Sequence, residues 1–270
     1  MKREWNGADQ FSFEVAGRPC WVAVPKTPAA GRPWVLRAPF AHVPMADKAL
    51  LEAGFHVAYI DASDPLGSPE AMKTWDAFYK EMTTTYALAA KPALIGISRG
   101  GLIIHKWAAV HPDQVGCIVG AAPVCDIKSW PGGKGLSGGH GGSWKLLQTV
   151  YGLTEQQAME YKQNPIDLLE PIAKAKIPVL HFYSPQDEGV PYEENSAVVA
   201  RKMKELGGDF TGVAIIISRD SIKGDAKLEA VQKRVDAKNP KAVAGAHNKA
   251  CNAADQTKVA EFIIKACKKS

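Results

Sequence analysis

The sequence of 270 residues lacks the features of several classes of protein. No segment approaches the roughly 20 consecutive apolar residues of a transmembrane helix, so we expect no membrane span. The net charge of +5 is modest and is spread along the chain, which argues against nucleic-acid and membrane partners. The start, Met1 to Asn6, has no apolar stretch behind it, so we expect no signal peptide there. We therefore expect either a cytoplasmic protein or a periplasmic or secreted one whose signal peptide was removed.

Cysteine is scarce, and its pattern points away from a metal site. The count is odd, and no two cysteines have Cys-x-x-Cys spacing, so we expect neither a bound metal nor a disulfide framework. No cofactor is implied. Cys117 lies in an apolar run and is expected in the core. A single disulfide, for example between Cys251 and Cys267, stays open. The five cysteines are Cys20, Cys117, Cys125, Cys251 and Cys267.

A glycine-rich stretch at residues 131–142 is not a phosphate-binding loop of the usual kind. It contains no Gly-Lys-Ser or Gly-Lys-Thr ending, and no apolar run leads directly into it. We expect instead a mobile rim or a linker into a small cap over residues 130–163.

Apolar runs alternate with segments of helical periodicity along most of the chain. Residues 11–26 alternate around Gly17-Arg18, as in a β-hairpin with one solvated face. The later runs are apolar without alternation, which is typical of a parallel sheet covered on both faces. We therefore predict a single α/β domain over residues 1–270, with a mostly parallel eight-stranded sheet. The later strands are expected at 33–40, 55–61, 92–95, 115–123, 177–184 and 213–218, and helices at 47–53, 69–88, 102–110, 144–162 and 257–266.

The run Gly96-Ile97-Ser98-Arg99-Gly100-Gly101 lies between an expected strand and an expected helix. Gly-x-Ser-x-Gly in this context is the nucleophile elbow of the α/β hydrolases, in which a serine occupies a sharp, strained turn. Glycines two positions away let the strand and the helix approach each other. Ser98 is thus the expected nucleophile.

A serine nucleophile needs a base and a carboxylate, which follow it in this fold in the order acid, then histidine. Asp187 lies just past the expected strand at 177–184, and it is our first choice of acid. Asp126, after the strand at 115–123, is the alternative. His247 is the only histidine expected in a loop between the strand at 213–218 and the last helix. It is therefore the expected base.

The oxyanion that forms during acyl transfer needs two backbone N–H donors. The residue after the nucleophile, Arg99, supplies one. Pro39 has no N–H, so the second donor is expected at Phe40 or Ala41, in the loop after the strand at 33–40. The His-Gly-Gly-Gly motif of many lipases is absent.

Weaker expectations concern substrate binding. His42 and His140 are in loops near the expected mouth of the site, and Trp130 and Tyr192 offer flat surfaces for sugar stacking. The Arg99 side chain is placed to meet a carboxylate or a sugar hydroxyl.

Four segments together make the chain similar to a group of bacterial single-domain serine hydrolases that are often encoded among polysaccharide-degrading enzymes. They are residues 93–102, 122–135, 164–167 and 187–195. This resemblance to the α/β-hydrolase superfamily implies a serine esterase acting on carboxylic esters, such as acetyl groups on sugars. The last 50 or so residues depart from it. A charged insert at 219–243, with helical spacing at Leu228, Val231 and Val235, precedes His247.

We therefore predict a serine carboxylic-ester hydrolase that forms an acyl-enzyme and acts on a small-molecule or carbohydrate ester. A peptidase or lactone hydrolase with the same triad, and a non-catalytic binding protein of the same fold, are the alternatives.

Overall fold

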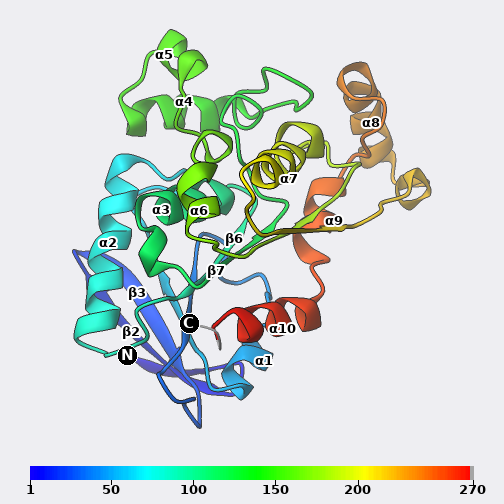
Figure 1. Cartoon of the computed structure of the whole chain (residues 1–270). Coiled ribbons are helices and arrows are strands. Elements are labelled where there is room, and N and C mark those ends of the chain that lie inside the picture. The colour runs from blue at the N-terminus through cyan, green and yellow to red at the C-terminus, as the bar shows by residue number, and fades with distance from the viewer. Residues whose placement is uncertain (268–270) are drawn as a thin grey trace.

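The computed structural model describes residues 1–267. In this part the chain forms a nine-stranded sheet with the order β1-β2-β3-β5-β4-β6-β7-β8-β9 (Figure 1). The strands are β1 (Lys2–Trp5), β2 (Ala8–Val15), β3 (Arg18–Val24), β4 (Trp34–Arg37), β5 (His56–Ile60), β6 (Ala93–Ile97), β7 (Cys117–Ala121), β8 (Val179–Tyr183) and β9 (Phe210–Ala214). The α-helices are α1 (Asp47–Glu52), α2 (Pro69–Thr84), α3 (Gly100–Val110), α4 (Gly141–Tyr151), α5 (Glu155–Glu160), α6 (Leu169–Lys174), α7 (Ser196–Glu205), α8 (Ala226–Lys238), α9 (Ala246–Asn252) and α10 (Gln256–Cys267).

The sheet is parallel from β5 to β9 and antiparallel at the other edge. The mostly parallel α/β architecture is thus confirmed, but the expected number of eight strands is wrong. The strand that the sequence did not reveal is β1, which is short, almost fully exposed and mostly polar. Such an edge strand is held by backbone pairing with β2 and buries too little to leave an apolar pattern.

Helices cover both faces of the sheet, because successive strand residues point to opposite sides. On one face Leu36 and Leu94 pack with α2, α3, α6 and α7. On the other face Val35 and Ile95 pack with α1, α9 and α10. Burying each such aliphatic side chain stabilises the fold by about 1.5–3 kcal/mol. None of the helices within residues 1–267 is long and apolar enough to cross a membrane.

The last strand lies earlier in the chain than the predicted one at 213–218. β9 pairs with β8 from Phe210 to Ala214, and after Ile215, whose N–H still donates to the Tyr183 carbonyl at 2.7 Å, the chain leaves the sheet. The backbone N–H of Ile217 donates instead to the side chain of Gln186, at 3.0 Å. The apolar run at 213–218 misled the prediction because Ile217 is buried without being paired in a strand, whereas Ile216 is 73% exposed.

The segment predicted as one helix at 144–162 is two helices, α4 and α5. Gly152 ends α4 in the left-handed region at φ 65°, and Thr154 then caps α5 through a hydrogen bond from the Gln157 N–H. Figure 1 shows this pair at one end of the molecule, beyond α3 and α6. The helical spacing expected in the charged insert is confirmed by α8.

All five cysteines lie in the described part of the chain and are free thiols. The Cys251–Cys267 pair, which the sequence left open, is not joined by a disulfide in this structure. Cys251 lies against His247, with its Sγ 3.5 Å from Nε2, whereas a hydrogen bond between the thiols of Cys117 and Cys267 joins β7 to α10.

Two fully buried histidines lie between α3 and β8. His105 donates from Nδ1 to the Gly101 carbonyl at 2.8 Å, so in the neutral ring its Nε2 is an acceptor. His181 donates to that atom from its own Nε2 at 3.1 Å, and its Nδ1 accepts from the Ser196 hydroxyl. Burial lowers the pKa of His105 to about 4 and the pKa of His181 well below its usual value. Both rings are thus neutral in the folded chain at neutral pH.

This pair should make the fold sensitive to acid. In the unfolded chain both histidines become protonated once the pH falls below about 6.5. In the folded chain the two rings stay neutral until the pH approaches their lowered pKa values. The contribution of the neutral pair to the free energy of unfolding is fully present above the pKa of the unfolded histidines, and it is lost as the pH falls toward about 4. The pair should contribute a slope of up to about 2.7 kcal/mol per pH unit to the free energy of unfolding.

Urea unfolding between pH 6 and pH 4.5 measures this slope. The double variant His105→Leu/His181→Phe should have a shallower slope, whatever its absolute stability. An unchanged slope in that variant would show that other groups cause the acid sensitivity.

Candidate active site

Ser98 occupies a strained turn between β6 and α3. Its φ is 51°, in the left-handed region that side chains seldom adopt. The turn is held by a hydrogen bond from the Ser98 N–H to the Ala121 carbonyl, at 2.9 Å. A Cβ at Gly96 would lie 2.7 Å from the Gly100 carbonyl oxygen, and one at Gly100, the second glycine of the motif, would lie 3.1 Å from the Ala38 Cβ. Local sterics thus set the spelling of the motif.

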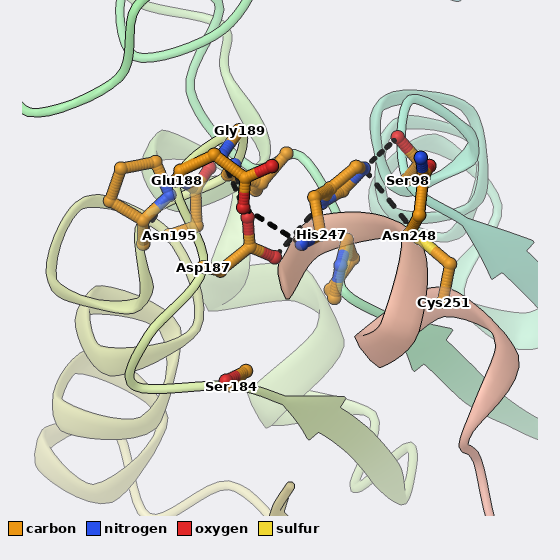
Figure 2. A network of polar contacts seen from close by, with 12 residues as sticks. Ser98, Ser184, Asp187, Glu188, Gly189, Asn195, His247, Asn248 and Cys251 are labelled. Atoms are coloured by element: carbon orange, nitrogen blue, oxygen red, sulfur yellow. Dashed lines mark hydrogen bonds and ion pairs between the residues drawn. The ribbon is translucent and has the colours of Figure 1, made fainter. Parts of the chain in front are cut away.

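Ser98, His247 and Asp187 form a continuous chain of hydrogen bonds (Figure 2). The Ser98 hydroxyl donates to His247 Nε2 at 2.8 Å, and His247 Nδ1–H donates to Asp187 Oδ2 at 2.9 Å. The three residues come from the ends of β6 and β8 and from α9, which are far apart in the sequence. The structure therefore brings together the predicted nucleophile, base and first-choice acid in hydrogen-bonding geometry.

Asp187 is oriented by the turn that carries it. Its side chain is only 1% exposed. Its Oδ1 accepts from the N–H groups of Gly189 and Val190, at 2.9 and 2.7 Å, which leaves Oδ2 for the imidazole. Burial alone lowers the pKa of His247, but the facing carboxylate of Asp187 outweighs it and raises that pKa well above its usual value. The carboxylate therefore stabilises the imidazolium that forms when the neutral ring takes up a proton at Nε2.

His247 is in the first turn of helix α9, and the predicted loop position is wrong. Gly245 enters the helix at φ 77°, a conformation that suits glycine. The Glu188 carboxylate accepts from the N–H groups of Gly245 and His247, both at 2.9 Å. Burial raises the pKa of Glu188. Glu188 thus fixes the backbone of the histidine while its neighbour Asp187 fixes the ring, a role that the sequence did not reveal.

The charged insert supports the segment that leads to His247. Gln232 of α8 donates to the Ala242 carbonyl and accepts from the Ala244 N–H. The Val243 N–H donates to the carbonyl of Gln186, at 2.9 Å, which joins this segment to the acid loop. Figure 1 shows α8 standing next to α9 on the outside of the molecule. The insert therefore helps to fix the backbone of the segment that precedes the histidine.

Two backbone N–H groups are expected to bind the oxyanion. Those of Phe40 and Arg99 form no backbone hydrogen bond within residues 1–267. Phe40 lies in the loop after β4 with φ 75°. The buried guanidinium of Arg37 holds this loop, because it pairs with Asp47 and donates to the carbonyl of Val43 at 2.6 Å. Arg37 and Asp47 were not among the predicted site residues.

Comparison with known proteins adds evidence on the fold. No protein-family model and no curated protein matches the sequence. Among solved structures, a Mycobacterium tuberculosis puromycin-hydrolyzing peptidase has a TM-score of 0.61 at 14% identity, over 78% of this chain and 36% of that one. A Pyrococcus horikoshii acylaminoacyl peptidase has a TM-score of 0.58 at 17% identity, over 83% of this chain and 38% of that one. The esterase rPPE has a TM-score of 0.58 at 16% identity, over 84% of this chain and 80% of that one.

The chain has the α/β-hydrolase fold. It spans a little over a third of the length of the two peptidase chains and most of the length of the esterase chain. At these identities the likeness concerns the fold alone, and the chemistry must be argued from the site. The site lies at the carboxyl ends of the parallel strands, where ligands bind in open α/β sheets.

The alternative acid Asp126 does not contact the imidazole in this α/β-hydrolase fold. Its Oδ1 accepts from the backbone N–H of Lys128 at 2.9 Å and pairs with the Lys128 ammonium at 3.2 Å. It therefore stabilises the loop after β7. Asp187 is the carboxylate that faces His247.

The four weaker candidates for substrate binding have different surroundings. Trp130 is half-buried, with its ring 5.9 Å from the Arg99 guanidinium. His42 is exposed, with its ring edge-on to Phe40. His140 caps α4, since its Nδ1 accepts from the Ser143 N–H. Tyr192 stacks on Tyr183 at 4.1 Å. Trp130 and His42 lie nearest to the oxyanion loop and Arg99, whereas His140 and Tyr192 have structural partners.

A groove of about 480 Å³ runs beside Trp130. Its walls are the glycine-rich loop at 136–139, the acid loop at Glu188 and Gly189, and helix α8. The loop is tied down, because Lys238 of α8 donates to the carbonyls of Gly133 and Ser137, both at 2.6 Å. The expected rim and the charged insert thus both line the groove.

Proposed function

We propose that this chain is a serine hydrolase that cleaves carboxylic esters through an acyl-enzyme. The observation that carries the proposal is the unbroken hydrogen-bond chain from the Ser98 hydroxyl through His247 to the Asp187 carboxylate. A serine hydroxyl is a weak nucleophile until a base takes its proton, and this arrangement supplies an oriented base.

Ser98 Oγ attacks the ester carbonyl carbon while His247 Nε2 takes the hydroxyl proton. The N–H groups of Arg99 and Phe40 stabilise the resulting oxyanion, each by about 2.7–4 kcal/mol in the transition state. The tetrahedral intermediate expels the alcohol, which receives the proton from His247, and leaves an acyl ester on Ser98. A water molecule then attacks the acyl carbon, with His247 again as base, and the acid leaves as the proton returns to Ser98.

The finer assignment is an esterase for decorated carbohydrates. It is supported by the resemblance of the four sequence segments to hydrolases encoded with polysaccharide-degrading enzymes. The half-buried ring of Trp130 beside the groove is a surface suited to sugar stacking. Amide hydrolysis is the second candidate, because two of the similar structures are peptidases. Turnover of acetylated sugars, aryl acetates and dipeptide amides, compared side by side, separates the two.

Labelling with an alkyl fluorophosphonate tests the proposed function directly. The folded chain should be modified once, and mass spectrometry of its peptides should locate the adduct on Ser98, because only an activated serine reacts readily. The Ser98→Ala variant and the urea-unfolded chain are the controls and should stay unlabelled. A folded wild-type chain that resists the probe would indicate a binding protein with a hydrolase fold.

A further inference from the structure

The arginine next to the nucleophile carries a charge that the protein does not neutralise. The Arg99 side chain forms no hydrogen bond and no ion pair with any residue in 1–267. Three other cations near the site are engaged, and a fourth, Arg234 beside the groove, has no partner within residues 1–267 but is exposed to solvent. Arg37 pairs with Asp47, Lys128 with Asp126, and Lys238 with two carbonyl groups. Arg99 differs from Arg234 because its unpaired charge is half-buried.

Aromatic rings hold this charge in place. The Arg99 guanidinium carbon lies 4.9 Å from the centre of the Phe40 ring and 5.9 Å from that of Trp130. A guanidinium that stacks on aromatic faces keeps its in-plane N–H groups free for acceptors, and their fork matches a carboxylate. Phe40 also carries the second expected oxyanion donor, so its ring fixes the charge beside the reacting carbonyl.

Arg99 is also half-buried, which makes its lack of a partner costly. Burial lowers the pKa of Arg99, yet the group stays charged because arginine titrates far above neutral pH. A neutral sugar hydroxyl would leave this charge uncompensated, whereas a carboxylate would compensate it through a charge-assisted, two-pronged contact. The site is therefore complementary to an anion beside the serine.

We propose that Arg99 binds a carboxylate of the substrate, so that the preferred substrate is a small ester with a carboxylate a few bonds from the scissile carbonyl. This inference rests on the proposed function, since it takes Ser98 as the nucleophile. The carboxylate belongs either to the acyl group or to the leaving group, and the geometry of Arg99 beside Ser98 serves both.

Two pairs of esters that differ by one carboxylate test the proposal. Phenyl acetate against 4-acetoxybenzoate places the charge on the leaving group, and methyl benzoate against monomethyl isophthalate places it on the acyl group. For at least one pair, kcat/KM should be about tenfold or more higher for the anionic member. In Arg99→Gln this ratio should fall by about tenfold or more, and Arg99→Lys should keep part of it.

Arg201→Gln is the matched control. It removes an equal charge from the exposed surface of α7 and should keep the wild-type ratio. A wild type that turns over both members of each pair equally, or an Arg99→Gln variant that keeps the preference, would overturn the carboxylate proposal. Failure of the proposed function would look different. All four esters would then resist hydrolysis, and the fluorophosphonate probe would leave Ser98 unlabelled.

Discussion

Asp187→Asn is expected to lower kcat for ester hydrolysis by about three to four orders of magnitude while the chain stays folded. The carboxylate accepts on both oxygens, from two backbone N–H groups at Oδ1 and from His247 at Oδ2. The asparagine side chain has one acceptor, its amide oxygen, and both backbone N–H groups would donate to that oxygen. Its NH₂ would then face Nδ1 and favour the tautomer with the proton on Nε2, which cannot accept the proton of Ser98.

Steady-state kinetics on phenyl acetate, with circular dichroism to verify folding, measure this effect. Asp126→Asn is the matched control, because it changes an aspartate that pairs with Lys128 and does not face the imidazole. It should keep kcat within about threefold, as is usual for changes outside the reacting groups. The opposite pattern, with Asp126→Asn inactive and Asp187→Asn active, would move the acid to the loop after β7.

The elbow could be predicted from the sequence because its cause is local. Ser98 needs a left-handed turn, and Gly96 and Gly101 are the residues whose side chains would collide with nearby backbone. The parallel strands were likewise visible, since burial on both faces requires continuous apolar runs. Asp187 followed from the order of residues in the fold, because the acid must come off a strand end on the same edge of the sheet as the serine.

The elements that position His247 were hidden because they act over long separations in sequence. The Glu188 carboxylate meets the N–H groups of Gly245 and His247 across 57 and 59 residues. Gln232 contacts the segment before the histidine from a surface helix whose sequence is largely polar. No periodicity marks either contact. Helix α9 is short, and the glycine at its start is as typical of a loop as of a helix entrance.

Asp47→Ala is expected to lower the free energy of unfolding by about 3–5 kcal/mol. The Arg37 and Asp47 side chains are 1% and 3% exposed, so the loss of the carboxylate leaves a buried cation without its counter-charge. Domains of this kind are stable by only about 5–15 kcal/mol, so the loss is large. Because Arg37 also holds the Val43 carbonyl in the loop that carries Phe40, kcat should fall as well. Urea unfolding and ester turnover measure the two effects.

Glu52→Ala is the control for this change, because it breaks an ion pair with Lys48 whose members are 68% and 73% exposed. Water solvates both charges there, so the effect of Glu52→Ala on the free energy of unfolding in urea should be too small to resolve. The double variant Arg37→Met/Asp47→Leu should recover much of the stability, since an apolar pair of similar volume needs no counter-charge. It should not recover kcat, because the Val43 carbonyl then has no guanidinium to hold the oxyanion loop. An Asp47→Ala protein as stable as the wild type would show that water reaches Arg37. Recovery of kcat in the double variant would show that the oxyanion loop keeps its shape without the Arg37 guanidinium.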